Sequence, residues 1–163
     1  MYDWLKSVGE WIETSPIAYA EIEWGLLTDF SIVGHYFGFF MVVGVNLAVD
    51  LRILGVRGRN RTASELAEQF FPWVWRFLGI VVLTGSLYLS PSARAFFSSS
   101  FFLLKLLLMV LAIVSSLLIQ WNVRKWEQSP ATPLLAKVLA VVSLLLWIGT
   151  ILAGTHVPIQ TLV

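Results

Sequence analysis

The sequence contains no cysteine and few charged residues. Without cysteine, the chain cannot form disulfides, thiolate metal sites, iron–sulfur clusters or covalent c-type haem attachments. Any cofactor would need histidine or weaker ligands. Charged residues make up only 13% of the chain and the formal net charge is +1. The sequence therefore predicts no strongly charged surface, and we expect no nucleic-acid partner.

The motifs of common enzyme classes are also missing. The sequence shows no Gly-x-Ser-x-Gly nucleophile turn, no glycine-rich phosphate loop followed by Lys-Ser or Lys-Thr, and no histidine–carboxylate cluster suited to a metal hydrolase. These absences argue against an independent enzyme and leave, at most, an electron-transfer role.

Apolar residues dominate what is present. They make up 58% of the 163 residues, and the mean hydropathy is +0.80, far above the range of soluble domains of this size. We predict an all-α fold, an integral membrane four-helix bundle, with residues 1–163 forming one membrane domain. The predicted transmembrane spans are residues 26–49, 71–90, 101–121 and 134–157, each about 20 residues or longer.

The N-terminal segment has a different pattern. Residues 2–14 alternate apolar and polar side chains at helical spacing, which predicts an amphipathic helix lying in the membrane interface. Pro16 interrupts that pattern. Further along, Thr62 followed by Glu65 is a capping-box pattern that predicts a helix start ahead of the second span.

The distribution of Lys and Arg predicts the orientation. Most of these residues fall in or near the first and third loops, which places those loops in the cytoplasm. We therefore expect a multi-pass protein of the bacterial inner membrane with both termini on the periplasmic side. The lipid bilayer is one expected partner, and other membrane subunits or a homo-oligomer are the other.

Only two histidines occur, His35 in the first span and His156 at the end of the fourth. Ionisable groups inside a membrane are functional candidates because burying them is costly. The two residues are candidate axial ligands of a b-type haem, although His156 lies about 9 Å further from the middle of its span. The alternative is that His35 bonds a neighbouring helix and His156 lies in the interface. Lys105 is a candidate contact for a haem propionate or a lipid, or else extends to the surface.

Several short motifs carry a family resemblance. They are His35-Tyr-Phe-Gly38, Asp50-Leu-Arg52-Ile-Leu-Gly55, Pro72-Trp73, Thr84-Gly85, Phe101 with Lys105, and Trp147-Ile-Gly149. With this H-x-x-G and D-L-R-x-L-G pattern the chain resembles, over its whole length, an uncharacterised bacterial family of four-helix membrane proteins, a domain of unknown function. The resemblance implies the fold and topology but no activity.

Two kinds of function remain open at this point. The first is a small non-catalytic subunit of a larger respiratory or photosynthetic inner-membrane complex, holding a b-type haem on the outer side for electron transfer. The alternative is a small oligomeric transporter or metal-handling permease, in which His35, Asn46 and Lys105 line a polar path.

Overall fold

The structure is a computed structural model that describes residues 3–56 and 61–157. Its helices are α1 (Asp3–Glu13), α2 (Pro16–Glu23), α3 (Gly25–Ile53), α4 (Ala63–Leu89), the 3-10 helix η1 (Ser90–Ser92), α5 (Ala93–Ser98), α6 (Ser100–Glu127) and α7 (Leu134–Thr155). The segments long and apolar enough to cross a membrane are Gly25–Ile53, Ala63–Ser98, Ser100–Glu127 and Leu134–Thr155. The prediction of an all-α, four-helix membrane protein is confirmed.

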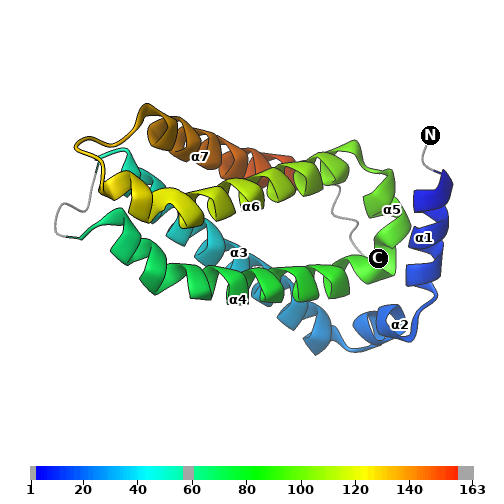
Figure 1. Ribbon diagram of the computed structural model, residues 1–163. Helices are drawn as coiled ribbons and strands as arrows, with labels where there is room; N and C mark the ends of the chain where they lie inside the picture. Colours follow the sequence, from blue (N-terminus) through cyan, green and yellow to red (C-terminus); the bar gives the residue numbers. More distant parts are fainter. Residues whose placement is uncertain (1–2, 57–60, 158–163) are drawn as a thin grey trace.

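The four long helices form an antiparallel bundle (Figure 1). Helix α3 packs against α4 and α7, and α6 packs against the same two helices. The first and last long helices are therefore neighbours. We call the half of the bundle next to α1 and α2 the terminal half. The other half, next to the α3–α4 and α6–α7 connections, is the loop half.

Helix α4 begins well before the predicted second span. Thr62 and Glu65 form the expected capping box, with Glu65 N 3.1 Å from Thr62 Oγ1 and Thr62 N 2.9 Å from Glu65 Oε2. Pro72 therefore lies inside the helix and not at its start. Pro72 is exposed on α4, and membrane helices tolerate an internal proline where other groups satisfy the freed backbone carbonyl.

The other long helices also differ from the predicted spans. Helix α3 continues to Ile53, whereas the first predicted span ends at residue 49. Helix α6 continues to Glu127, whereas the third predicted span ends at residue 121. Both extensions carry charged residues, among them Arg124 and Lys125 in the last turn of α6. A predicted apolar run ends at the first charged residues, whereas the helix itself continues past them.

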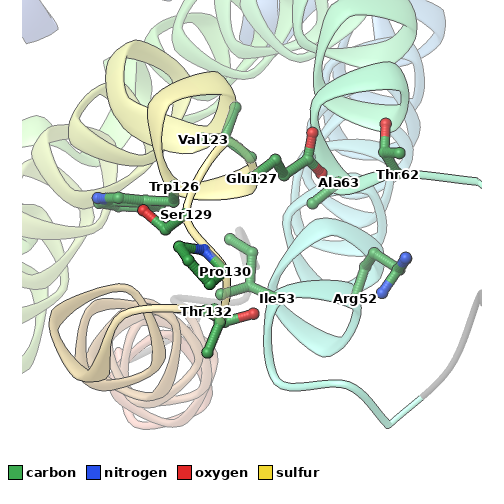
Figure 2. A pocket seen from close by; sticks show the side chains of 11 residues that line it. Arg52, Ile53, Thr62, Ala63, Val123, Trp126, Glu127, Ser129, Pro130 and Thr132 are labelled. Atoms are coloured by element: carbon green, nitrogen blue, oxygen red, sulfur yellow. The ribbon is translucent and has the colours of Figure 1, made fainter.

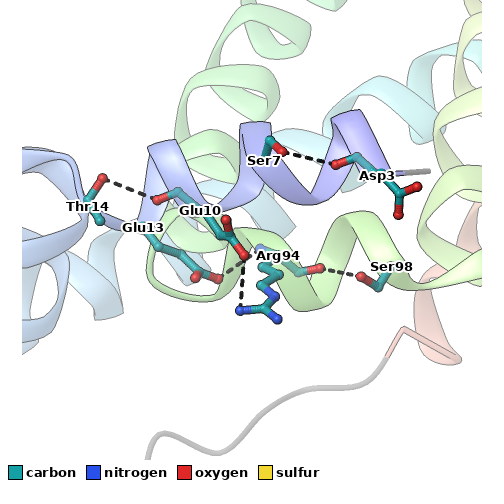
Figure 3. Close-up of polar contacts among 7 residues, drawn as sticks. All are labelled: Asp3, Ser7, Glu10, Glu13, Thr14, Arg94 and Ser98. Atoms are coloured by element: carbon teal, nitrogen blue, oxygen red, sulfur yellow. Dashed lines mark hydrogen bonds and ion pairs between the residues drawn. The ribbon is translucent and has the colours of Figure 1, made fainter.

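Short helices cover the terminal end of the bundle. Pro16 is the first residue of α2, which Ser15 caps, because proline suits the first turn of a helix. The segment between the second and third predicted spans forms η1 and α5. Helix α1 packs on α5, where Arg94 Nη1 lies 3.2 Å from Glu10 Oε1 and Arg94 N donates to Glu13 Oε1 at 2.8 Å (Figure 3).

Glycine allows α1 and α5 to touch. A β-carbon on Gly9 would lie 2.6 Å from the Cα of Arg94 and 2.8 Å from its backbone nitrogen, closer than real atoms approach. Because these atoms belong to backbone, any larger side chain at this position would push the two helices apart. Trp4 and Trp11 are exposed on α1, as expected for a helix in the membrane interface.

Small residues line the buried face of α7. They are Ala136, Ala140, Ser143, Thr150 and Ala153, and Trp147 is the one large member of the row. Small side chains let membrane helices approach closely, so van der Waals packing replaces the hydrophobic effect as the main source of stability. Within this close packing, the few polar side chains of the bundle are enclosed by all four long helices.

Candidate functional site in the polar interior

Polar and ionisable side chains recur along the inward face of α3. Ser31, Asn46 and Asp50 are each 1% exposed or less, and His35 is half-buried. The row runs from residue 31 to residue 50, and these 19 steps correspond to about 28 Å of helix, nearly the thickness of the hydrocarbon layer. The interior of the bundle is therefore polar at both ends of the membrane.

In the terminal half, His35 faces α4. Its Nδ1 lies 3.0 Å from the backbone carbonyl oxygen of Val81. A carbonyl only accepts hydrogen bonds, so Nδ1 carries the proton and donates it. In the neutral ring, Nε2 then keeps its lone pair, so it can take up a proton, accept a hydrogen bond or bind a metal ion.

The second interior charge is Lys105 on α6. Its side chain packs along α7, where a β-carbon on Gly154 would lie 3.6 to 3.8 Å from Lys105 Cδ, Cε and Nζ. Its charge also acts on the imidazole of His35. Among the described residues the ion pairs are Arg94–Glu10 and Arg124–Glu68, and neither involves Lys105. His35 and Lys105, which we call the terminal cluster, therefore lie together in the bundle without a carboxylate counter-ion from residues 3–56 and 61–157.

His156 lies in different surroundings. It is exposed, its Nδ1 is 2.9 Å from the carbonyl oxygen of Leu152, and its ring stacks on Phe101 with centroids 5.1 Å apart. His35, by contrast, contacts α4. The described conformation thus provides one interior imidazole and not the facing pair that two axial haem ligands require. The haem site at His35 and His156 stays a prediction, and we derive no electron-transfer step from it.

Gly85 determines how His35 is held. A β-carbon on Gly85 would lie 2.8 Å from both Cε1 and Nδ1 of the His35 ring. Gly85→Ala is therefore expected to turn the imidazole away from Val81 and to destabilise the fold by about 1 kcal/mol, the value of one hydrogen bond. The measurement is the nitrogen-15 spectrum of the imidazole, which reports the tautomer.

The matched control for this change is Gly79→Ala, since Gly79 lies on the same helix and, its own helical turn aside, no atom lies within 4 Å of where its β-carbon would be. An unchanged imidazole spectrum in Gly85→Ala would contradict the assigned contact.

In the loop half, a second polar group joins α3 to α6 and α7. Ser116 Oγ donates to Asn46 Oδ1 at 2.6 Å, and Asn46 Nδ2 donates to the carbonyl oxygen of Val42 at 2.8 Å. Asp50 lies one turn further along α3, with Ser143 of α7 facing it. We call Asn46, Asp50, Ser116 and Ser143 the loop cluster.

An apolar section separates the two clusters. Val42 is fully buried, and a β-carbon on Gly38 would lie 3.0 Å from Val81 Cγ2 and 3.3 Å from the carbonyl oxygen of Phe77. Trp147 fills the space on the other side, with its ring centroid 6.1 Å from that of Phe39. From the terminal half to the loop half, the interior of the bundle is thus polar at the terminal cluster, apolar and tightly packed in the middle, and polar again at the loop cluster.

The sequence indicated only part of this arrangement. The sequence singles out His35, Asn46 and Lys105 as polar residues within the apolar spans, and in the structure Asn46 is buried and the other two are half-buried. Ser116 and Ser143 were missed because serine is common in membrane helices. The available signal was helical spacing from other small residues. Ser116 lies one turn after Ala112 on α6, and Ser143 continues the row of Ala136 and Ala140 on α7.

Comparison with known proteins supports the resemblance and adds no activity. A family model described as a family of unknown function, DUF6644, matches residues 8–160. No curated protein and no solved structure matches the chain.

Proposed function

The chain belongs to DUF6644, a family of unknown function, and from the geometry of its interior we propose that it is a small permease. In this proposal a small ion passes between the two clusters inside the four-helix bundle. The apolar section around Val42 and Gly38 separates them in the described conformation and must open during transport.

One observation carries the proposal: ionisable side chains lie inside the bundle at two depths without counter-ions among the described residues. His35 and Lys105 form one group, and Asp50 lies 15 residues from His35 along α3, or about 22 Å. Charged groups in a membrane interior are costly and mark ion or substrate pathways more often than structural features. A purely structural bundle has no need to retain them.

Flux through reconstituted protein tests the proposal. The purified chain is placed in liposomes that contain a pH-sensitive dye, and a membrane potential is imposed with potassium and valinomycin. Proton entry faster than in protein-free liposomes is expected, and parallel assays with sodium and chloride examine the other small ions. If none of the three ions moves faster than in empty liposomes, the proposal is wrong.

A second candidate function is a lateral subunit of a larger membrane assembly. The observation that favours it is an exposed aromatic row on α3, where Phe30, Phe37 and Phe40 are 75%, 57% and 67% exposed. Gentle extraction from the native membrane would then yield the chain together with a partner. A monomer without copurifying protein contradicts this function. A reduced-minus-oxidised visible spectrum of the same sample tests the haem prediction separately.

A further inference from the structure

The carboxyl group of Asp50 is buried without a complete set of hydrogen bonds. Asp50 is 1% exposed, and its Oδ2 has no hydrogen-bond partner in the described structure. Ser143 is 0% exposed, and its Oγ also lacks a partner, although the two side chains face each other across α3 and α7. A buried polar atom left without a partner is costly, so a bound species that supplies or accepts a hydrogen bond is favoured here.

No cation compensates Asp50 among the described residues. At this end of the bundle, Arg52 Nε donates to the carbonyl oxygen of Arg61 at 2.5 Å, Arg124 Nε lies 2.7 Å from Glu68 Oε1, and Lys137 is exposed. A buried carboxylate without a counter-ion carries the full desolvation penalty of one ion. A neutral carboxyl group avoids that cost and can donate its proton to the Ser143 hydroxyl.

The acidic groups at this end of the bundle are also engaged elsewhere. Glu65 belongs to the capping box of α4, and Glu68 pairs with Arg124. Glu127 accepts a hydrogen bond from the backbone nitrogen of Ser64 at 3.0 Å. None of these carboxylates is placed to share a proton with Asp50 directly.

A cavity lies at the loop end of the molecule, next to the last turn of α3. It has a volume of about 380 Å³ and lies between α3, α4, α6 and residues 129–132 (Figure 2). That is room for several water molecules of about 30 Å³ each. Ile53 lines the cavity and lies three residues after Asp50, so the two side chains are neighbours on one face of α3.

We propose that Asp50 is a proton-binding group of this protein, loaded through the cavity that Ile53 lines. Trp147, whose ring fills the apolar section, follows Ser143 by one helical turn on α7, and its buried Nε1 also lacks a hydrogen-bond partner among the described residues. The proton would be the coupling ion of the permease. Only that use of the proton rests on the proposed function, since the binding itself does not require transport.

A hydrophobic carbodiimide tests the binding on the full-length protein in liposomes. A protonated carboxyl group adds across one C=N bond of the reagent, its proton moves to nitrogen, and rearrangement leaves an N-acylurea that retains the whole reagent. Peptide mass spectrometry is expected to find the adduct on Asp50, with less adduct at about pH 9 than at about pH 6. The Asp50→Asn protein provides the blank for this peptide. Glu21 is a second carboxyl group that is 1% exposed, and its labelling is measured separately because it lies in a different peptide.

The outcomes distinguish the two proposals. Absence of the adduct on Asp50 at both pH values overturns proton binding, and so does an extent of labelling that is independent of pH. Protection by sodium at constant pH shows that Asp50 binds Na⁺ in place of a proton and also overturns the assignment. Labelling without any ion flux in the liposomes keeps the proton site and removes the permease.

Infrared spectroscopy tests the access route. The carboxyl band that disappears in Asp50→Asn shifts when deuterium replaces the proton. Thr132→Trp fills the cavity and is expected to slow this exchange on the order of tenfold. Gln128→Trp is the matched control, because Gln128 is exposed in the same segment but does not line the cavity. Equal exchange rates in the two variants overturn the route.

Discussion

Lys105→Met is expected to reduce ion flux by about tenfold or more, equivalent to about 1.4 kcal/mol, while making the protein more stable to heat. Methionine keeps the length and apolar surface of the lysine side chain but removes its charge. The charge lies inside the bundle beside His35 and has no carboxylate partner among the described residues. Its removal therefore relieves a desolvation cost.

The expected gain in stability is about 1 kcal/mol, or a rise of about 2–4 °C in the melting temperature for a chain of this size. Flux in liposomes and thermal unfolding in detergent are measured on the same preparation. Opposite changes in activity and stability are typical of a residue retained for function.

Lys137→Met is the matched control, since Lys137 is exposed at the start of α7. It is expected to change neither quantity. A loss of both flux and stability in Lys105→Met would instead give Lys105 a structural role, and the terminal cluster would no longer support a transport function.

The largest loss of stability is expected for Trp147→Ala. Trp147 is 2% exposed, fills the apolar section between α7 and α3, and packs edge-on against Phe39. Its removal leaves a large cavity, because the other buried residues of α7 are small and cannot fill the space. Losses of about 3–5 kcal/mol accompany such truncations of buried aromatic side chains.

Trp121→Ala provides the comparison, because Trp121 is 71% exposed. Thermal or denaturant unfolding in detergent is expected to separate the two variants clearly, with Trp121→Ala close to the unchanged protein. Similar stabilities for both variants would show that the α3–α7 contact contributes little to the fold.

These two tryptophans illustrate the limits of the sequence. Eight tryptophans in a membrane protein suggest an aromatic belt at the two interfaces. Trp121, near a span end, fits that interpretation, whereas Trp147 is a core residue. Since lipid and protein interiors are both apolar, the composition of a span does not distinguish its lipid-facing side from its buried side.

The histidines illustrate the same limit. The sequence predicts His35 and His156 on the outer side of the membrane, and the structure shows that their helices, α3 and α7, are neighbours. The direction of each ring depends on tertiary contacts. His35 contacts Val81 and Gly85 of α4, whereas His156 stacks on Phe101. A contact between helices depends on rotation about each helix axis, which a span prediction leaves undetermined.

The sequence by itself determined the membrane location, the four helices and the capped start of α4. These features depend on the length of apolar runs and on hydrogen bonds between residues close in the chain. Only the tertiary structure decided that Asn46 and Asp50 share one interior with Ser116, Ser143 and Lys105. The reason is physical: a polar side chain avoids lipid by facing other helices, but which partner it meets depends on the packing of residues far apart in the sequence.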